Sequence, residues 1–237
     1  QVVSDYKLLG YRCNAEHRHY NGNIEKAAGE SYLTAIRIST LAVGHFGRVR
    51  LIATSAVPVL TACSQWSKLI TKTEEKLVTA NLKAIWGQKR KLRCAGIVFG
   101  VLYDPTRLHP GFAMQWTVLC NARRMLNKVP SIKQATIRVI KSIKHGTGQH
   151  KTVPGQVGWL MHWATMSGFE LDVEASDEIM LKRYGRTCIP LLSWNQTAWQ
   201  LEVKMQMKLG LMGAVCIQVN KTREEEEPRG EDMVGIE

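Results

Sequence analysis

The sequence lacks the glycine loops with which proteins cradle phosphate groups. Neither G-x-x-x-x-G-K-[ST] nor G-x-G-x-x-G is present, which excludes the P-loop and the dinucleotide-binding enzymes. The G-x-S-x-G turn of the α/β-hydrolases is absent too. Two-metal catalysis needs clustered carboxylates, and the aspartates never lie in a pair: Asp5, Asp104, Asp172, Asp177 and Asp232. We therefore expect no catalytic residue in this chain.

Cysteine usage gives no disulfide framework and no zinc site. The six cysteines are scattered without a C-x-x-C pair, which is typical of reduced thiols inside a cell. Cys13, His17 and His19 lie close together in the sequence but have no fourth ligand nearby. The acidic residues between Asp172 and Glu178 fit a solvated turn better than a metal site. We expect no metal and no cofactor in this chain.

Long apolar runs and a signal peptide are also missing. No apolar run approaches the 18 or more residues that cross a bilayer, and the N-terminus has no signal-peptide pattern. We expect an intracellular protein, nuclear or cytoplasmic, with no membrane partner. The chain begins at Gln1 in strand-like sequence without a methionine, so we expect it to be a fragment of a longer polypeptide.

Acidic residues are scarce in the middle of the chain. Residues 31–151 contain 20 Lys and Arg against 3 acidic residues, a net charge of +17, whereas residues 224–237 carry a net charge of −6. The whole chain carries +12. A basic body of this size predicts binding to nucleic acid, or less often to an anionic membrane surface. A generally basic soluble protein without a polyanionic partner is the alternative.

The order of helix, strand and turn signals predicts a mainly α fold. Residues 1–23 are expected to form a strand or hairpin edge that continues from a missing upstream domain. Residues 24–145 are expected to form a basic, bundle-like helical domain. After a polar, glycine-rich linker, residues 155–221 are expected to form a smaller mixed α/β segment, and residues 222–237 an acidic, disordered tail.

Particular residues mark the ends of the expected helices. The motif Thr71-x-x-Glu74 has the spacing of a capping box at a helix start, and Gly87 is placed to end the same helix. Pro58 is expected to kink or split the helix that contains it. Pro110 and Pro130 suit the first turns of two further helices.

Three stretches are expected to be strands: Phe169–Val173, Cys188–Leu192 and Ala214–Val219. The first alternates between apolar and other side chains, which is the period of a strand. A helix between Trp194 and Leu211 separates the last two. The apolar run Cys94–Tyr103 fits either a short buried helix or a strand.

Paired and clustered cations are the candidate nucleic-acid contacts. Arg48 and Arg50 begin one helix, and Arg123 and Arg124 lie near the end of another. The densest cluster follows Gly87 in a short connection: Lys89, Arg90, Lys91 and Arg93. Four phosphate contacts would give a salt slope of about 3–4. A solvated loop is the alternative for this cluster, and a favourable charge at a helix end is the alternative for the second arginine pair.

Four short segments follow one another in an order found in one protein family. Lys7–Tyr11 reads Lys-Leu-Leu-Gly-Tyr, and Leu51–Cys63 contains Leu-Ile and Val-Pro ahead of a tryptophan. Leu82–Gly87 ends in Ile-Trp-Gly, and the basic Arg90–Cys94 follows it. Together they resemble the region after the palm in reverse transcriptases of LINE-type (non-LTR) retrotransposons. That family usually has tyrosine where this chain has Leu8.

The resemblance covers residues 5–130, and more weakly Arg229–Ile236. It implies that the chain is the thumb and following connection of such a reverse transcriptase, a helical region that grips the RNA or DNA template–primer duplex through its backbone. The catalytic aspartates, and the magnesium that the parent polymerase would use, belong to a palm and fingers domain that would precede Gln1. The chain is not expected to polymerise nucleotides by itself.

The resemblance also assigns places to the basic residues. The segment Lys7–Gly10 would lie near the primer terminus, with Lys7 and Gly10 as candidate contacts, and Arg12 is a further candidate contact with nucleic acid. The arginine pair at 48 and 50 and the cluster at 89–93 would contact phosphates without reading bases. Two other functions stay open: a stand-alone helical RNA- or DNA-binding module, and a capsid-like assembly protein whose basic face neutralises packaged nucleic acid.

Overall fold

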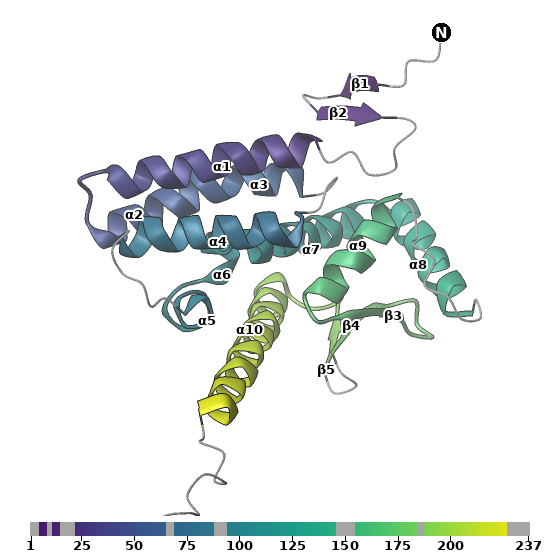
Figure 1. Cartoon of the computed structure of the whole chain (residues 1–237). Coiled ribbons are helices and arrows are strands. Elements are labelled where there is room, and N and C mark those ends of the chain that lie inside the picture. Colours follow the sequence, from purple (N-terminus) through teal and green to yellow (C-terminus); the bar gives the residue numbers. More distant parts are fainter. Residues whose placement is uncertain are drawn as a thin grey trace, which may run out of the picture.

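The fold is mainly helical, with a small antiparallel sheet, as the sequence predicts (Figure 1). The computed structural model describes residues 5–8, 11–14, 22–64, 69–87, 94–145, 155–183 and 187–226. A two-stranded hairpin comes first, formed by β1 (Asp5–Leu8) and β2 (Tyr11–Asn14). Most of the helices precede the sheet in the chain, and one long helix follows it.

Three helices lie side by side and form the first layer (Figure 1). They are α1 (Gly22–Thr40), α3 (Val57–Cys63) and α4 (Thr71–Trp86). Apolar residues recur along α1 at helical spacing and bury Ile24, Ala28 and Ala35 against its neighbours. The short α2 (His45–Leu51) connects α1 to this layer through a sharp reversal of the chain.

Pro58 changes the hydrogen bonding of its helix, as expected from its missing N–H. A π-helical turn, η1 (Ile52–Ala56), stands between α2 and α3, and the Val57 N–H bonds to the Ile52 carbonyl five residues back. The wider turn is a known way for a helix to absorb such a residue. The hydrogen bonding of the helix therefore changes just before the proline, while the junction residues Leu51, Ala56 and Val57 keep helical φ and ψ.

The stretch His45–Cys63 is long and apolar enough to cross a membrane by length and composition, so the expectation that no run approaches this length is wrong. In the fold, its residues Ile52, Ala56 and Leu60 are fully buried. They pack against α1 and its neighbours. Core helices of globular proteins pass the same length and composition criteria, so the stretch carries no further conclusion about a membrane.

The ends of α4 agree only in part with the sequence signals. Gly87 ends the helix with a positive φ of 88° and donates its N–H to the Lys83 carbonyl, as predicted. The helix begins at Thr71, as the motif predicted, but the capping box itself is wrong, because Ile70 is the N-cap residue and no side chain caps the helix. Glu74 turns away from its own helix end and lies against Gly111, where a Cβ would come within 1.8 Å of its carboxylate.

A second group of helices links this layer to the sheet. The apolar run after Cys94 is helical, as α5 (Ala95–Ile97) and the π-helical turn η2 (Val98–Leu102), and α6 (Pro105–Leu108) follows. The prolines at 110 and 130 start α7 (Pro110–Lys128) and α8 (Pro130–His145), as predicted.

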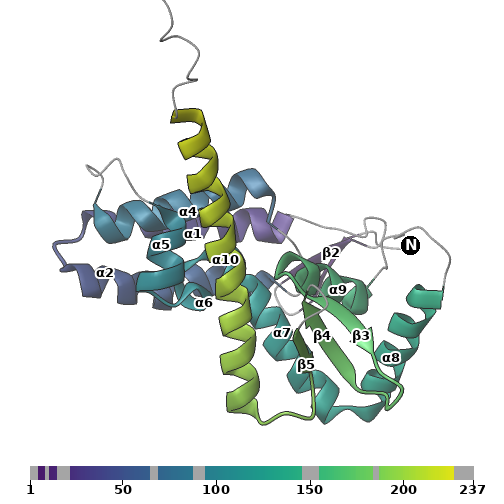
Figure 2. The ribbon, with the colours of Figure 1, turned by 90° about the horizontal axis from the view of Figure 1, so that it is seen from below.

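The sheet has the order β3–β4–β5, with antiparallel neighbours. Its strands are β3 (Glu170–Val173), β4 (Ile179–Arg183) and β5 (Thr187–Pro190), and α9 (Gly155–Met166) precedes them. Helices α8 and α9 contact β3, and α10 (Gln196–Glu226) contacts β5 (Figure 2). The central strand β4 was not expected, because the first three of its residues are all buried and show no alternation.

The third expected strand, Ala214–Val219, is wrong, because these residues belong to α10. The expected tail also begins later, since α10 continues to Glu226, and residues 227–237 lie outside the described residues. One hydrophobic cluster contains Met114 and Leu119 of α7, Leu171 of β3 and Trp199 of α10. The helical and the mixed segments therefore share a core.

Candidate nucleic-acid interface

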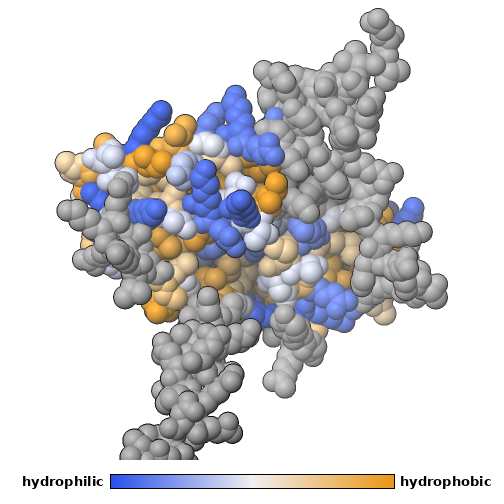
Figure 3. Space-filling model, in the orientation of Figure 1, coloured by the Kyte–Doolittle hydropathy of each residue, from blue (hydrophilic) through white to orange (hydrophobic). Residues whose placement is uncertain are grey.

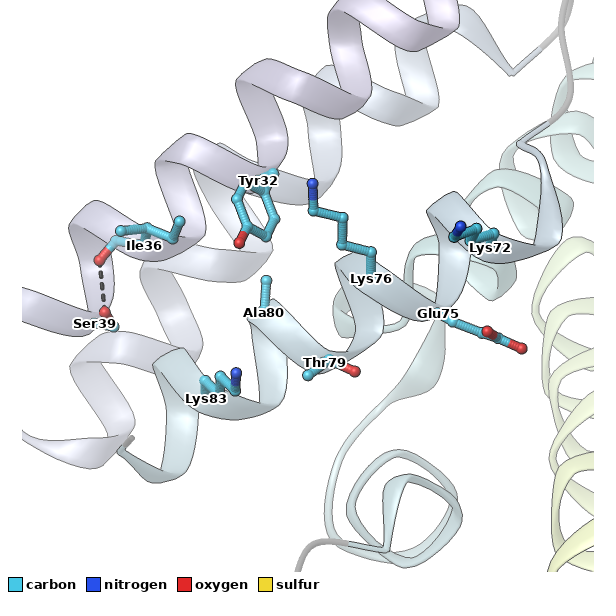
Figure 4. A pocket seen from close by; sticks show the side chains of 9 residues that line it. All are labelled: Tyr32, Ile36, Ser39, Lys72, Glu75, Lys76, Thr79, Ala80 and Lys83. Carbon is cyan, nitrogen blue, oxygen red and sulfur yellow. Dashed lines mark hydrogen bonds between the residues drawn. The ribbon is translucent and has the colours of Figure 1, made fainter. Parts of the chain in front are cut away.

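An open groove between α1 and α4 gathers three lysines on one side (Figure 4). It has a volume of about 290 Å³. The residues that line it are Tyr32, Ile36, Ser39, Lys72, Glu75, Lys76, Thr79, Ala80 and Lys83. Lys72, Lys76 and Lys83 come from α4, and Tyr32, Ile36 and Ser39 face them from α1.

Helical periodicity places the three lysines in one row. Lys72, Lys76, Thr79 and Lys83 are spaced four, three and four residues apart, which brings their side chains onto one face of α4. The opposite face is held down by buried apolar residues: Leu77, Leu82, Ala84 and Ile85. Burial of that face fixes the rotation of the helix, so the lysine row must point outward along the groove.

The groove is basic, with little compensation from acids. Glu75 is the acidic residue of the lining, and in Figure 4 its carboxylate points away from α1. The Lys76 ammonium lies 4.4 Å from the centre of the Tyr32 ring, a cation–π contact that orients the side chain toward α1. Hydrophilic side chains cover much of this face of the molecule, with apolar ones between them (Figure 3).

The two arginines of α2 have different surroundings. Arg50 is exposed and available to an anion. Arg48 is half-buried and donates from Nη2 to the Leu41 carbonyl at 3.1 Å. Arg48 therefore holds the turn between α1 and α2, which leaves less of its guanidinium for a phosphate than the sequence led us to expect.

The arginine pair of α7 is divided between the interior and the surface. Arg124 is exposed, but Arg123 is only 4% exposed. Its guanidinium donates to the carbonyls of Leu191 and Trp194 and to the side-chain oxygen of Gln196. The expected phosphate contact is thus wrong for Arg123, because its guanidinium is buried and donates to these three protein oxygens.

The remaining predicted residues lie at the margins of the described chain. In the hairpin, the strand register sets Lys7 directly opposite Arg12. Gly10 lies outside the described residues. The cluster Lys89, Arg90, Lys91 and Arg93 lies outside them as well, in the connection that leaves α4 after Gly87. Their contact with nucleic acid stays a prediction.

Several charged side chains around the sheet are already paired. Lys141 of α8 lies 2.6 Å from the Asp177 carboxylate, and Lys182 pairs with Asp172 across the β3–β4 hairpin. Glu178 accepts the backbone N–H groups of residues 192 and 193. Within the described part of the chain, no group of three or more His, Cys, Asp and Glu side chains could hold a metal ion. The lysine row therefore stands out as the anion-binding candidate.

Comparisons of the chain with protein-family models, with curated proteins and with solved structures find no match.

Proposed function

We propose that this chain binds the sugar–phosphate backbone of nucleic acid along the lysine row of α4. The observation that carries the proposal is the groove between α1 and α4, which is lined by three lysines and by only one acidic residue, Glu75. Lysine ammonium groups are well suited to phosphate oxygens and carry no base specificity. The high net charge of residues 31–151 supports the same class of partner.

The geometry fits an elongated polyanion better than a compact anion. The row extends over twelve residues of α4, from Lys72 to Lys83, and the eleven steps between its ends span about 16 Å at about 1.5 Å per residue. Phosphates of a backbone strand repeat along such a length, whereas a single small anion would contact one lysine at a time. We further propose, on the motif resemblance, that the bound form is the template–primer duplex of a LINE-type reverse transcriptase whose palm lies on a preceding domain.

Neutralising the row is expected to weaken duplex binding strongly. In the triple variant Lys72→Gln, Lys76→Gln, Lys83→Gln, affinity for a labelled duplex should fall about tenfold per lost contact in 0.1 M salt. The magnitude of the log–log salt slope should fall by about 2.7, since each phosphate contact contributes about 0.9. Fluorescence anisotropy over a series of salt concentrations measures both quantities.

A matched control variant distinguishes the effect of the lysine row from the effect of the protein's net charge. The variant Lys26→Gln, Lys128→Gln, Lys133→Gln removes the same charge from α1, α7 and α8, away from the groove lining. It should lower affinity by less than the row variant and leave most of the slope in place. Equal losses in the two triple variants would show that net charge, and not the row, binds the duplex.

A further inference from the structure

An apolar tip projects where α1 turns into α2, at one end of the lysine row. Its side chains Leu41, Val43 and Phe46 are 43%, 38% and 81% exposed. A phenylalanine with four-fifths of its surface in water is costly to keep, because burying such a ring is worth about 1.5–3 kcal/mol. The exposure therefore points to a partner surface.

The tip is held by specific contacts. Arg48 donates to the Leu41 carbonyl at 3.1 Å, and the Arg48 N–H bonds to the Gly44 carbonyl. Val43 lies directly on Gly47, where a Cβ would come within 2.3 Å of a Val43 methyl carbon. Because Gly47 has no Cβ, the turn can pack closely on α2 at this point, and the preceding residue, Phe46, extends from a backbone that these contacts hold.

The tip continues the groove. Lys83 and Ser39 line the end of the groove, and Ser39 precedes Leu41 by two residues. His45 bonds through Nδ1 to the Ile85 carbonyl at 3.1 Å, and its ring lies 4.9 Å from that of Trp86. The last turn of α4 therefore carries the final lysine of the row and packs against His45, the residue before Phe46.

We propose that Phe46 stacks on an unpaired base of the nucleic acid whose backbone the lysine row holds, so that the chain prefers a duplex with a single-stranded extension to a blunt duplex. This inference rests on the proposed function. An exposed aromatic ring next to a row of cations is the combination that single-stranded nucleic acid requires: a flat apolar surface for a base and ammonium groups for its phosphates. The His45 and Phe46 rings lie 5.6 Å apart at an interplanar angle of 75°, so the two rings are not stacked on one another.

The experiment compares a blunt DNA duplex with the same duplex carrying a single-stranded overhang, using the full chain. Wild-type protein should bind the overhang duplex about tenfold more tightly, and Phe46→Ala should lose this preference, because stacking is worth about 1–3 kcal/mol per base. Blunt-duplex affinity and the salt slope should change little. Phe46→Tyr should keep the preference, since the ring remains.

Two further variants distinguish stacking from other apolar contacts. Phe46→Leu keeps an apolar side chain without a flat ring, so it should bind the overhang as weakly as the alanine variant. Val101→Ala, at an exposed apolar position of η2, should behave as wild type. Retention of the preference in Phe46→Leu or Phe46→Ala would overturn the proposal. Binding of wild type to phosphatidylserine vesicles that is lost in Phe46→Ala, without an effect on the overhang, would assign the tip to a membrane surface instead.

The row variant keeps the two proposals apart. If Lys72→Gln, Lys76→Gln, Lys83→Gln weakens both duplexes while Phe46→Ala changes neither, the backbone-binding function stands and stacking is refuted. If the row variant binds both duplexes as wild type does, the backbone-binding function fails, whatever the effect of Phe46→Ala.

Discussion

Replacing Arg123 with alanine is expected to lower the free energy of unfolding by about 1–3 kcal/mol, the range for leaving a buried hydrogen-bonding group without its partner. The guanidinium of Arg123 ties α7 to the turn before α10 through the carbonyls of Leu191 and Trp194 and the amide oxygen of Gln196. It also lies 4.8 Å from the centre of the Trp199 ring. Alanine would leave buried acceptors without donors and open space beside the ring.

The neighbouring residue provides the control for this prediction. Arg124→Ala removes the same charge from an exposed position of the same helix and should change stability by less than about 0.5 kcal/mol. Arg123→Lys should resemble Arg123→Ala, because one ammonium cannot reproduce the planar fork. Urea denaturation of the three variants measures the differences. Equal stabilities for Arg123→Ala and Arg124→Ala would contradict the structural role of Arg123.

His109 is expected to make the protein less stable as the pH falls from about 6.5 to 4. Burial lowers the pKa of His109 to about 4, from 6.5 in the unfolded chain. The ring lies between Phe99 and Phe112 and caps α7, because Nδ1 accepts the Phe112 N–H at 3.3 Å. A proton on Nδ1 would remove that hydrogen bond and place a positive charge at the positive end of the helix.

The sign follows from proton uptake. Between pH 6.5 and about 4, His109 is protonated in the unfolded chain but neutral in the folded chain. Acidification across this range therefore lowers the free energy of unfolding. A shift of this size is worth about 3 kcal/mol. Glu74, whose carboxylate lies 3.9 Å from Nδ1, has a pKa that is raised first by burial and then by the charge of Glu75. Its protonation on acidification therefore increases the free energy of unfolding, which is opposite to the effect of His109.

The variant His109→Asn isolates this contribution. Asparagine can accept the same N–H at the start of α7 but does not titrate. Its free energy of unfolding, measured by denaturation at a series of pH values, should depend less on pH than that of wild type between pH 7 and 4. Parallel curves for the two proteins over this range would show that His109 is protonated equally in the folded and unfolded states.

Local signals in the sequence predicted the fold well where a single residue decides the outcome. Pro110 and Pro130 lack an N–H and begin helices where that group has no partner. Gly87 ends α4 because it adopts a positive φ at little cost. Pro58 has no N–H to donate within its helix, and a π-helical turn, η1, comes just before it. Each of these effects is independent of the tertiary contacts.

The errors lie where tertiary contacts override local preference. Strand β4 is covered by its neighbours and so lacks alternation, while residues 214–219 have β-branched content but continue α10. Glu74 has the spacing of a cap but is drawn to the start of α7, 37 residues later in the chain. Arg123 resembles a surface arginine in sequence, and only the return of the chain at 191–196 encloses it.

The lysine row was missed although a signal for it was present. Lys72, Lys76 and Lys83 are separated by apolar and polar residues, so they form no dense cluster of cations in the sequence. Their spacing places them on one face of a helix, and the structure sets that face along a groove. Phe46 had no signal, since its exposure depends on how the turn between α1 and α2 folds.

The salt dependence of duplex binding by the wild-type chain tests the central claim most directly. The account predicts that the association constant falls linearly with salt on a log–log plot, with a slope magnitude of at least about 2.7 for the three lysines. It also predicts equal slopes and affinities for duplexes of unrelated sequence, because phosphate contacts carry no base information. Absence of duplex binding at low salt, or binding that does not change with salt, would contradict it.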